Sequence, residues 1–73
     1  MKMIKGFETE LVRVEKLEKV ESEGLVYYVH EVGLGNNEHD ALFRFTSFDE
    51  VSAYFDAIYA LLVCNNVKII KQF

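Results

Sequence analysis

The chain has no proline, no tryptophan, one cysteine and only four glycines in 73 residues. Without proline or a glycine-rich stretch, collagen-like, linker and low-complexity proteins are excluded. One cysteine cannot form an internal disulfide, which excludes a small scaffold held by disulfides and favours a reducing compartment. The longest apolar run, residues 57–64, is too short to span a bilayer, and residues 1–5 do not resemble a targeting segment. We therefore expect a cytoplasmic protein with no membrane partner.

What the sequence does contain is typical of a folded domain. Hydrophobic side chains make up 51% of the residues and charged ones 27%, a composition too apolar for a disordered tail. A chain of this length can build only one hydrophobic core. Residues 1–73 are therefore expected to form a single small domain.

The net charge of −4 is unevenly distributed along the chain. Residues 31–56 hold six acidic side chains against Arg44 alone, and the remaining basic residues are dispersed. Nucleic acids are bound by clustered lysine and arginine, so no nucleic-acid partner is expected. The acidic middle is compatible with a basic protein partner, although moderate negative charge also serves solubility alone.

A helix is predicted over residues 48–64. Ser47 and Glu50 have the spacing of a capping box, and Asn65-Asn66 supplies a stop because asparagine tolerates the left-handed conformation. Five apolar residues then recur at the helical period and should form the core face. They are Phe48, Val51, Phe55, Ile58 and Leu62.

Strands are predicted from alternation and from β-branched or aromatic content over residues 25–32, 41–46 and 67–71. Residues 35–37, Gly-Asn-Asn, predict a turn between the first two of these strands. Residues 8–21 fit either a helix or a strand. The valines and the turn at Glu23-Gly24 favour a strand, with a bulge near Lys16 because Leu17 falls out of phase.

These elements predict an α+β fold of order β-β-β-α-β. A small antiparallel meander would carry one helix on one face, and a C-terminal strand would return to the sheet. A crossover through the helix makes this last strand run in the same direction as residues 41–46. It can join beside either edge of the meander.

No residue pattern indicates catalysis, a cofactor or a metal. Cys64 lies at the helix C-terminus, where the dipole disfavours a thiolate. His30 and its neighbour Glu31 point to opposite faces of a strand and do not form a pair. His39 is flanked by acidic residues but has no second histidine or cysteine at ligand spacing. The chain is therefore not expected to be an enzyme.

Three sets of residues are candidates for protein binding. Tyr27 and Tyr28 are consecutive in a strand, so at least one must lie on the face that the helix does not cover. The carboxylates of Glu21, Glu23, Asp49 and Glu50 should gather at one end of the fold and steer a basic partner. On the helical wheel, small residues cluster opposite the core face and predict a homodimer interface: Ala53, Ala57, Ala60 and Cys64.

The leading hypothesis is therefore a small acidic cytosolic protein-interaction module, an inhibitor or adaptor that docks on a larger protein. In size and acidity alone, the chain is similar to phage-encoded inhibitors of bacterial machinery. The alternative is a structural homo-oligomer that associates through the alanine and cysteine face of the helix or through the open face of the sheet.

Overall fold

The computed structural model describes residues 1–36 and 38–73. Asn37, part of the turn predicted over residues 35–37, lies outside the described residues. Along the chain, the elements are β1 (Lys2–Glu8), β2 (Val12–Glu21), β3 (Gly24–Gly33), β4 (Asp40–Phe45), α1 (Phe48–Cys64) and β5 (Lys71–Gln72).

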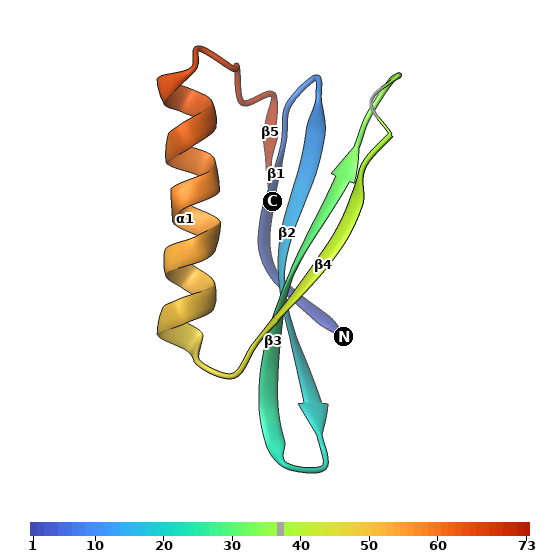
Figure 1. Cartoon of the computed structure of the whole chain (residues 1–73), viewed down its shortest axis with the longest axis vertical. Helices are drawn as coiled ribbons and strands as arrows, with labels where there is room; N and C mark the ends of the chain where they lie inside the picture. Colours follow the sequence, from blue (N-terminus) through green and yellow to red (C-terminus); the bar gives the residue numbers. More distant parts are fainter. Residues whose placement is uncertain (37) are drawn as a thin grey trace.

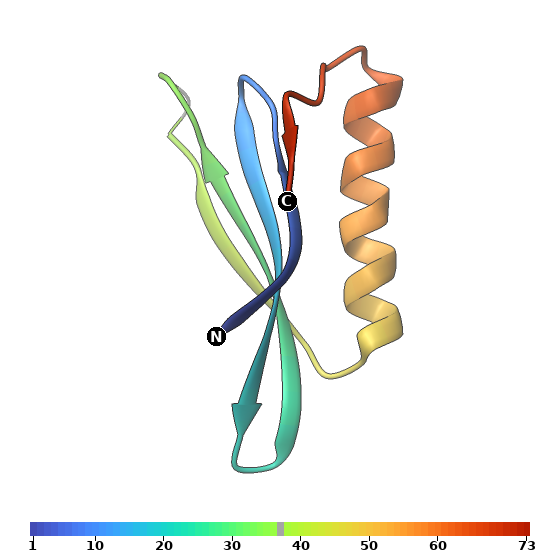
Figure 2. The same ribbon diagram turned by 180° about the vertical axis from the view of Figure 1, so that it is seen from behind.

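All of the strands form one sheet, in the order β4-β3-β2-β1-β5, and every neighbouring pair is antiparallel. Helix α1 packs on one face of this sheet, and the hairpin of β2 and β3 extends beyond the start of the helix (Figure 1, Figure 2). The α+β class is confirmed, with an antiparallel meander, one helix and a C-terminal strand that joins the sheet. The meander has one strand more than the sequence predicted.

The additional strand is β1, which was not predicted from the sequence. It ends at Glu8, and the segment predicted as one strand over residues 8–21 is divided there by a tight turn. The buried hydroxyl of Thr9 organises this turn, because it accepts hydrogen bonds from the backbone N–H groups of Leu11 at 3.0 Å and Val12 at 3.1 Å. Strand β2 therefore begins only at Val12.

The bulge predicted in this segment near Lys16 lies on the other strand of the pair. The irregularity is in β1, between Met3 and Lys5, whereas β2 pairs with β3 without interruption. Leu17 is out of phase with the valines because it belongs to the far face of the sheet, away from α1. Lys16 takes the core-facing position and is only 4% exposed.

The final strand begins later than the predicted range of 67–71 and shares only Lys71 with it. Only Lys71–Gln72 forms β5, and it runs antiparallel to β1 and in the direction of β4, as the crossover predicted. Ile70 already donates its N–H to the carbonyl of Glu8 at 2.8 Å, and Phe73 exchanges backbone hydrogen bonds with Gly6. The strand therefore joins the sheet beside β1.

The helix is confirmed over its whole predicted length. The Ser47 side chain accepts a hydrogen bond from the N–H of Glu50 at 3.3 Å, and Asn66 adopts the left-handed conformation at φ 61°. The predicted core face does point toward the sheet, and its Val51 and Phe55 are buried. Phe48, at the start of this face, is not part of the core, because it is 49% exposed. The buried cluster consists of Phe7, Val14, Val29, Val51 and Phe55.

In the part of the chain that the structure describes, no helix combines the length and apolar character needed to cross a membrane.

Candidate protein-binding surfaces

Tyr27 and Tyr28 lie on opposite faces of the sheet, as predicted. Tyr27 faces the helix side and packs edge-on against Phe48, with ring centroids 5.6 Å apart. Tyr28 lies on the far face, where its hydroxyl donates a hydrogen bond to Glu21 at 2.8 Å. Of the two rings, Tyr28 is therefore the one that the helix leaves uncovered.

Charged side chains cover much of this far face. Arg13 lies between two carboxylates, those of Glu8 and Glu15, at 3.2 Å from each. His30 in turn lies 3.3 Å from Glu15 and 2.9 Å from Asp40. This chain of contacts crosses from β1 to β4. It makes this part of the far face polar, and association of two copies through the open sheet face stays a prediction.

A second polar cluster lies on the far face near the β2–β3 turn, around Glu21. Arg44 donates a hydrogen bond to Glu21 at 3.1 Å, and Lys19 lies 3.9 Å from the same carboxylate. The hydrogen bond from the Tyr28 hydroxyl, and after it the hydrogen bond from the Arg44 guanidinium, lower the pKa of Glu21 below its usual value. The carboxylate of Glu21 is therefore already neutralised within the fold.

The other three predicted acidic residues remain without such partners. Glu23 lies in the β2–β3 turn, and Asp49 and Glu50 lie in the first turn of α1, at the same end of the molecule (Figure 1). In the described part of the chain, none of these three carboxylates forms an ion pair. The negative potential at this end therefore rests on them rather than on Glu21.

Beside these acidic residues lies an apolar surface that the sequence analysis did not identify. Val20 and Leu25 are direct partners across the β2–β3 hairpin and are 78% and 51% exposed. Leu25 shares a face with Tyr27, two residues on, and Tyr27 contacts the half-exposed Phe48. We call Val20, Leu25, Tyr27 and Phe48 the hairpin-end surface.

The hairpin-end surface adjoins a shallow hollow of about 410 Å³. Its wall is formed by Met1, Lys2, Glu18, Lys19, Val20 and Leu25. The surface exists because the hairpin is longer than the distance that α1 covers. The apolar side chains at its end have no helix to pack against.

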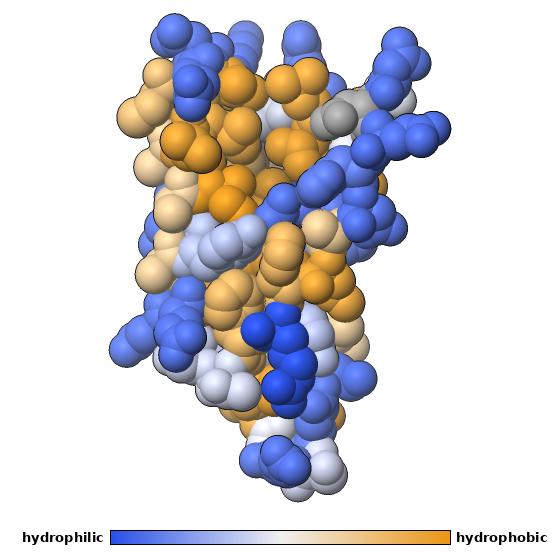
Figure 3. Space-filling model, in the orientation of Figure 1, coloured by the Kyte–Doolittle hydropathy of each residue, from blue (hydrophilic) through white to orange (hydrophobic). Residues whose placement is uncertain are grey.

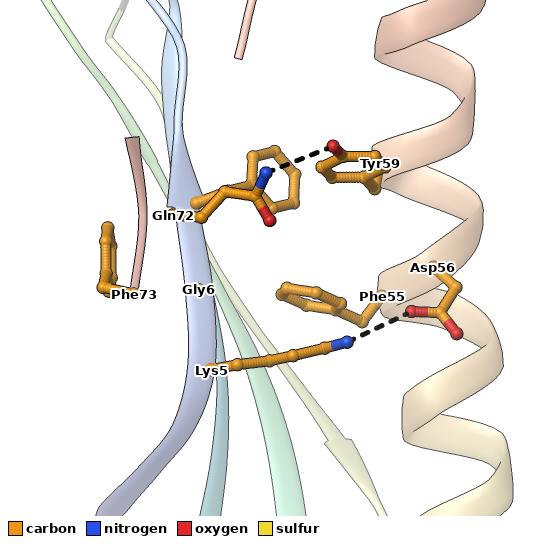
Figure 4. Close-up of a pocket in the computed structure, with 8 residues that line it drawn as sticks. Lys5, Gly6, Phe55, Asp56, Tyr59, Gln72 and Phe73 are labelled. Carbon is orange, nitrogen blue, oxygen red and sulfur yellow. Dashed lines mark hydrogen bonds and ion pairs between the residues drawn. The ribbon is translucent and has the colours of Figure 1, made fainter. Parts of the chain in front are cut away.

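A second hollow, of about 380 Å³, lies between α1 and the edge formed by β1 and β5. Lys5 and Gln72 reach toward the helix, where Lys5 lies 3.9 Å from Asp56 and Gln72 donates to the Tyr59 hydroxyl at 3.5 Å (Figure 4). The polar groups that line this hollow are thus paired with one another. We therefore interpret this hollow as a seam where the helix meets the sheet, rather than as a ligand site.

Lys16 is the buried cation next to this seam. Its ammonium group donates to the Ser52 hydroxyl at 3.1 Å and lies 5.0 Å from the centroid of the Phe48 ring. Burial, and secondarily the charge of Lys5, lower the pKa of Lys16 below its usual value. Its hydrogen bond to Ser52 and its contacts with the rings of Phe48 and Phe55 hold the amine between β2 and α1.

The small residues predicted as an oligomer interface, Ala53, Ala57, Ala60 and Cys64, are all exposed on the outer side of α1. Their contact with a second helix stays a prediction, because alanine is also the best helix former for a solvent-exposed position. Among the described residues, no group of three or more histidine, cysteine, aspartate or glutamate side chains is placed to hold a metal ion.

Strand β4 is the most exposed of the four long strands. No residue in it is fully buried, and Leu42 and Phe43 are 53% and 40% exposed on its two faces. The Phe43 ring packs at 5.4 Å from that of Tyr54, whose hydroxyl donates to Glu31 at 3.0 Å. Burial and this hydrogen bond raise the pKa of Tyr54. Apolar side chains gather between α1 and β4 in the view of Figure 3, which has the orientation of Figure 1.

Comparison with known proteins adds no family to this description. No protein-family model, curated protein or solved structure significantly matches the chain. The surfaces themselves are therefore the basis on which a function can be proposed.

Proposed function

We propose that the chain is a cytoplasmic protein-interaction module, an inhibitor or adaptor, that docks on a larger protein through the hairpin-end surface. The observation that carries this proposal is the exposure of Val20 and Leu25, at the hairpin end beyond α1, together with Phe48 in the first turn of α1. Contiguous exposed apolar side chains with a polar rim are typical of protein-binding sites.

The charges around the patch favour a partner with basic residues. Glu23, Asp49 and Glu50 lie at the same end of the fold and are not neutralised by ion pairs within the described chain. A local negative potential attracts a basic partner and raises its association rate more than its affinity. The apolar patch then supplies the contact area, and the carboxylates supply the steering.

The test is a comparison of partners captured by matched variants from a lysate of the source cells. Val20→Thr with Leu25→Thr makes both side chains more polar and places residues that favour strands at both positions of the hairpin. Leu61→Gln is the control, because Leu61 is 65% exposed on α1, far from the hairpin. A protein bound by the native chain and by Leu61→Gln, but lost with the double variant, supports the proposal. Equal capture by all three chains contradicts it.

Once such a partner is purified, the steering can be measured directly. Glu23→Lys should slow association several-fold at low salt, and the difference from the native chain should shrink as salt screens the charges. Glu10→Lys reverses an exposed carboxylate outside this cluster and is the matched control. Equal association rates for the native chain and Glu23→Lys would leave the acidic residues with no part in binding.

A further inference from the structure

Strand β4 forms one edge of the sheet, and among the described residues it pairs with β3 alone. One contact shows which backbone groups of β4 face β3. The N–H of Gly33 donates to the carbonyl of His39 at 2.6 Å, so Gly33 and His39 form a hydrogen-bonded pair directly next to the pair of Val32 and Asp40. Hydrogen-bonded and non-bonded pairs alternate along an antiparallel ladder. The residues whose N–H and C=O groups point away from β3 are therefore Asp40, Leu42 and Arg44.

This edge lacks most of the features by which proteins normally prevent strand addition. Such edges carry charged side chains, above all lysine, or proline, bulges or a covering segment. The charged residues of β4 are Asp40 and Arg44, one of each sign. Strand β4 contains no lysine or proline, and it pairs with β3 over its full length without a register shift. Its free backbone groups thus form a regular template for another strand.

The side chains along the template are self-complementary. Asp40 lies two residues before Leu42 and Arg44 two residues after it, on the same face of the strand. In an antiparallel pair of two identical strands centred on Leu42, Asp40 of each copy is opposite Arg44 of the other. Within one copy, Asp40 contacts His30 at 2.9 Å and Arg44 contacts Glu21 at 3.1 Å. Both side chains nevertheless remain well exposed, 77% for Asp40 and 47% for Arg44, so they can also reach across the pair.

The other face of the strand fits the same alignment. There the large Phe43 of each copy comes to lie opposite the small Ala41 of the other, which avoids a clash of two large side chains. Phe43 already extends the apolar surface that runs from β4 to Tyr54 on α1. The second copy would cover the part of that surface nearest the edge.

From these observations we propose that two copies of the chain pair through β4, antiparallel and centred on Leu42, so that one sheet continues through both copies. Asp40, Leu42 and Arg44 then each exchange backbone hydrogen bonds with the second strand. Opposite charges flank a central Leu42–Leu42 contact. The interface differs from the hairpin-end surface, so either proposal can fail without the other.

The sharpest test uses two variants that are matched to each other. Asp40→Arg places arginine opposite arginine in the dimer, and Arg44→Asp places aspartate opposite aspartate. Each variant alone should dimerise about tenfold more weakly than the native chain. An equimolar mixture should recover the native affinity, because every opposed pair in the mixed dimer again has opposite charges. Sedimentation equilibrium measures all four samples, and circular dichroism verifies that the single variants are folded.

Three results would overturn the proposal: a native chain that is monomeric at high micromolar concentration, single variants that dimerise as well as the native chain, or a mixture that fails to recover. The register is tested separately by Leu42→Cys in a Cys64→Ser background. Direct partners in a hydrogen-bonded pair lie about 5.5 Å apart at Cα, within disulfide range. Oxidation should link Leu42→Cys rapidly and the exposed control Leu61→Cys slowly. Equal rates would contradict this register.

Discussion

The two edges of the sheet are built in opposite ways. The β1 edge carries Lys2 and Lys5, has a bulge between Met3 and Lys5, and is covered by β5 from Gly6 onward. The β4 edge has a regular backbone and no lysine, and no other strand of the described chain covers it. Edge protection is a device against unwanted pairing. Its presence at one edge alone indicates that the other edge is available for pairing.

The edges also differ in how firmly they are tied to the core. Strand β1 contributes Phe7, which is 1% exposed and packs edge-on against Phe55 and Tyr59 at 5.4 Å and 5.2 Å. Strand β4 contributes no fully buried side chain. The protected edge is therefore part of the folding core, whereas the open edge is peripheral to it.

The largest expected effect compares a phenylalanine from each edge. Phe7→Ala should lower the free energy of unfolding by about 3–5 kcal/mol, because it removes a buried ring and leaves a cavity. Phe43→Ala should cost about 1 kcal/mol, because that ring is 40% exposed. Urea unfolding measures both, at concentrations low enough to keep the chain monomeric. Similar losses for the two variants would show that β4 belongs to the core as much as β1 does.

A second substitution removes the protection of the β1 edge. Phe73 packs across Gly6, where a Cβ would lie 2.6 Å from its ring carbon Cε2 and 2.8 Å from the carbonyl oxygen of Val14. Gly6→Ala should therefore displace the C-terminal residues from β1 and cost about 1–3 kcal/mol. Hydrogen exchange should show faster exchange of the Phe73 amide, which bonds to Gly6 in the native chain. Gly35→Ala tests a glycine with open space around it, although its φ of 66° also disfavours alanine.

Local signals in the sequence were sufficient for the helix and for the two tyrosines. The cap at Ser47 and the stop at Asn66 depend on neighbouring residues only, and the opposite faces of Tyr27 and Tyr28 follow from strand geometry. Strand β1 could not be predicted in this way. Its lysines and Gly6 interrupt any apolar alternation, and the strand forms because Phe7 reaches partners more than forty residues away in the sequence.

The candidate interfaces depend on the length of the β2–β3 hairpin relative to α1 and on the register of β4 on β3, and neither can be read from the sequence. Val20 and Leu25 are exposed only because the hairpin outreaches α1. The arrangement of Asp40 and Arg44 about Leu42 is visible in the sequence. Which backbone groups point outward, however, follows from the register of β4 on β3. The acidic cluster was predicted with Glu21 included, but the exposed Arg44 guanidinium is close enough to neutralise that carboxylate.

A third substitution separates the open edge from the fold. Leu42→Pro removes an N–H that points away from β3, and edge strands tolerate proline at such positions. We expect a folded monomer that is less stable by about 1 kcal/mol and no longer dimerises. Phe43→Pro is the control, because its N–H faces β3 and its loss leaves a ladder bond unmade. If Leu42→Pro unfolds the chain as severely as Phe43→Pro, the assignment of outward-facing residues is wrong.

The smallest expected effect concerns the contact that ties the end of β4 to the hairpin. The Tyr28 hydroxyl and the Arg44 guanidinium hold the pKa of Glu21 below its usual value. The folded chain therefore binds the Glu21 proton less readily than the unfolded chain. The resulting stabilisation is complete above the unfolded pKa of about 4.3 and is lost as the pH falls through the lower folded value.

Glu21→Gln should therefore have a lower urea midpoint than the native chain at pH 6, and the difference should shrink at pH values below the folded pKa. Glu23→Gln, in the neighbouring turn and without an ion pair, is the matched control and should follow the native chain at both pH values. A difference for Glu21→Gln that persists unchanged in acid would mean that packing, not charge, joins β4 to the hairpin at this point.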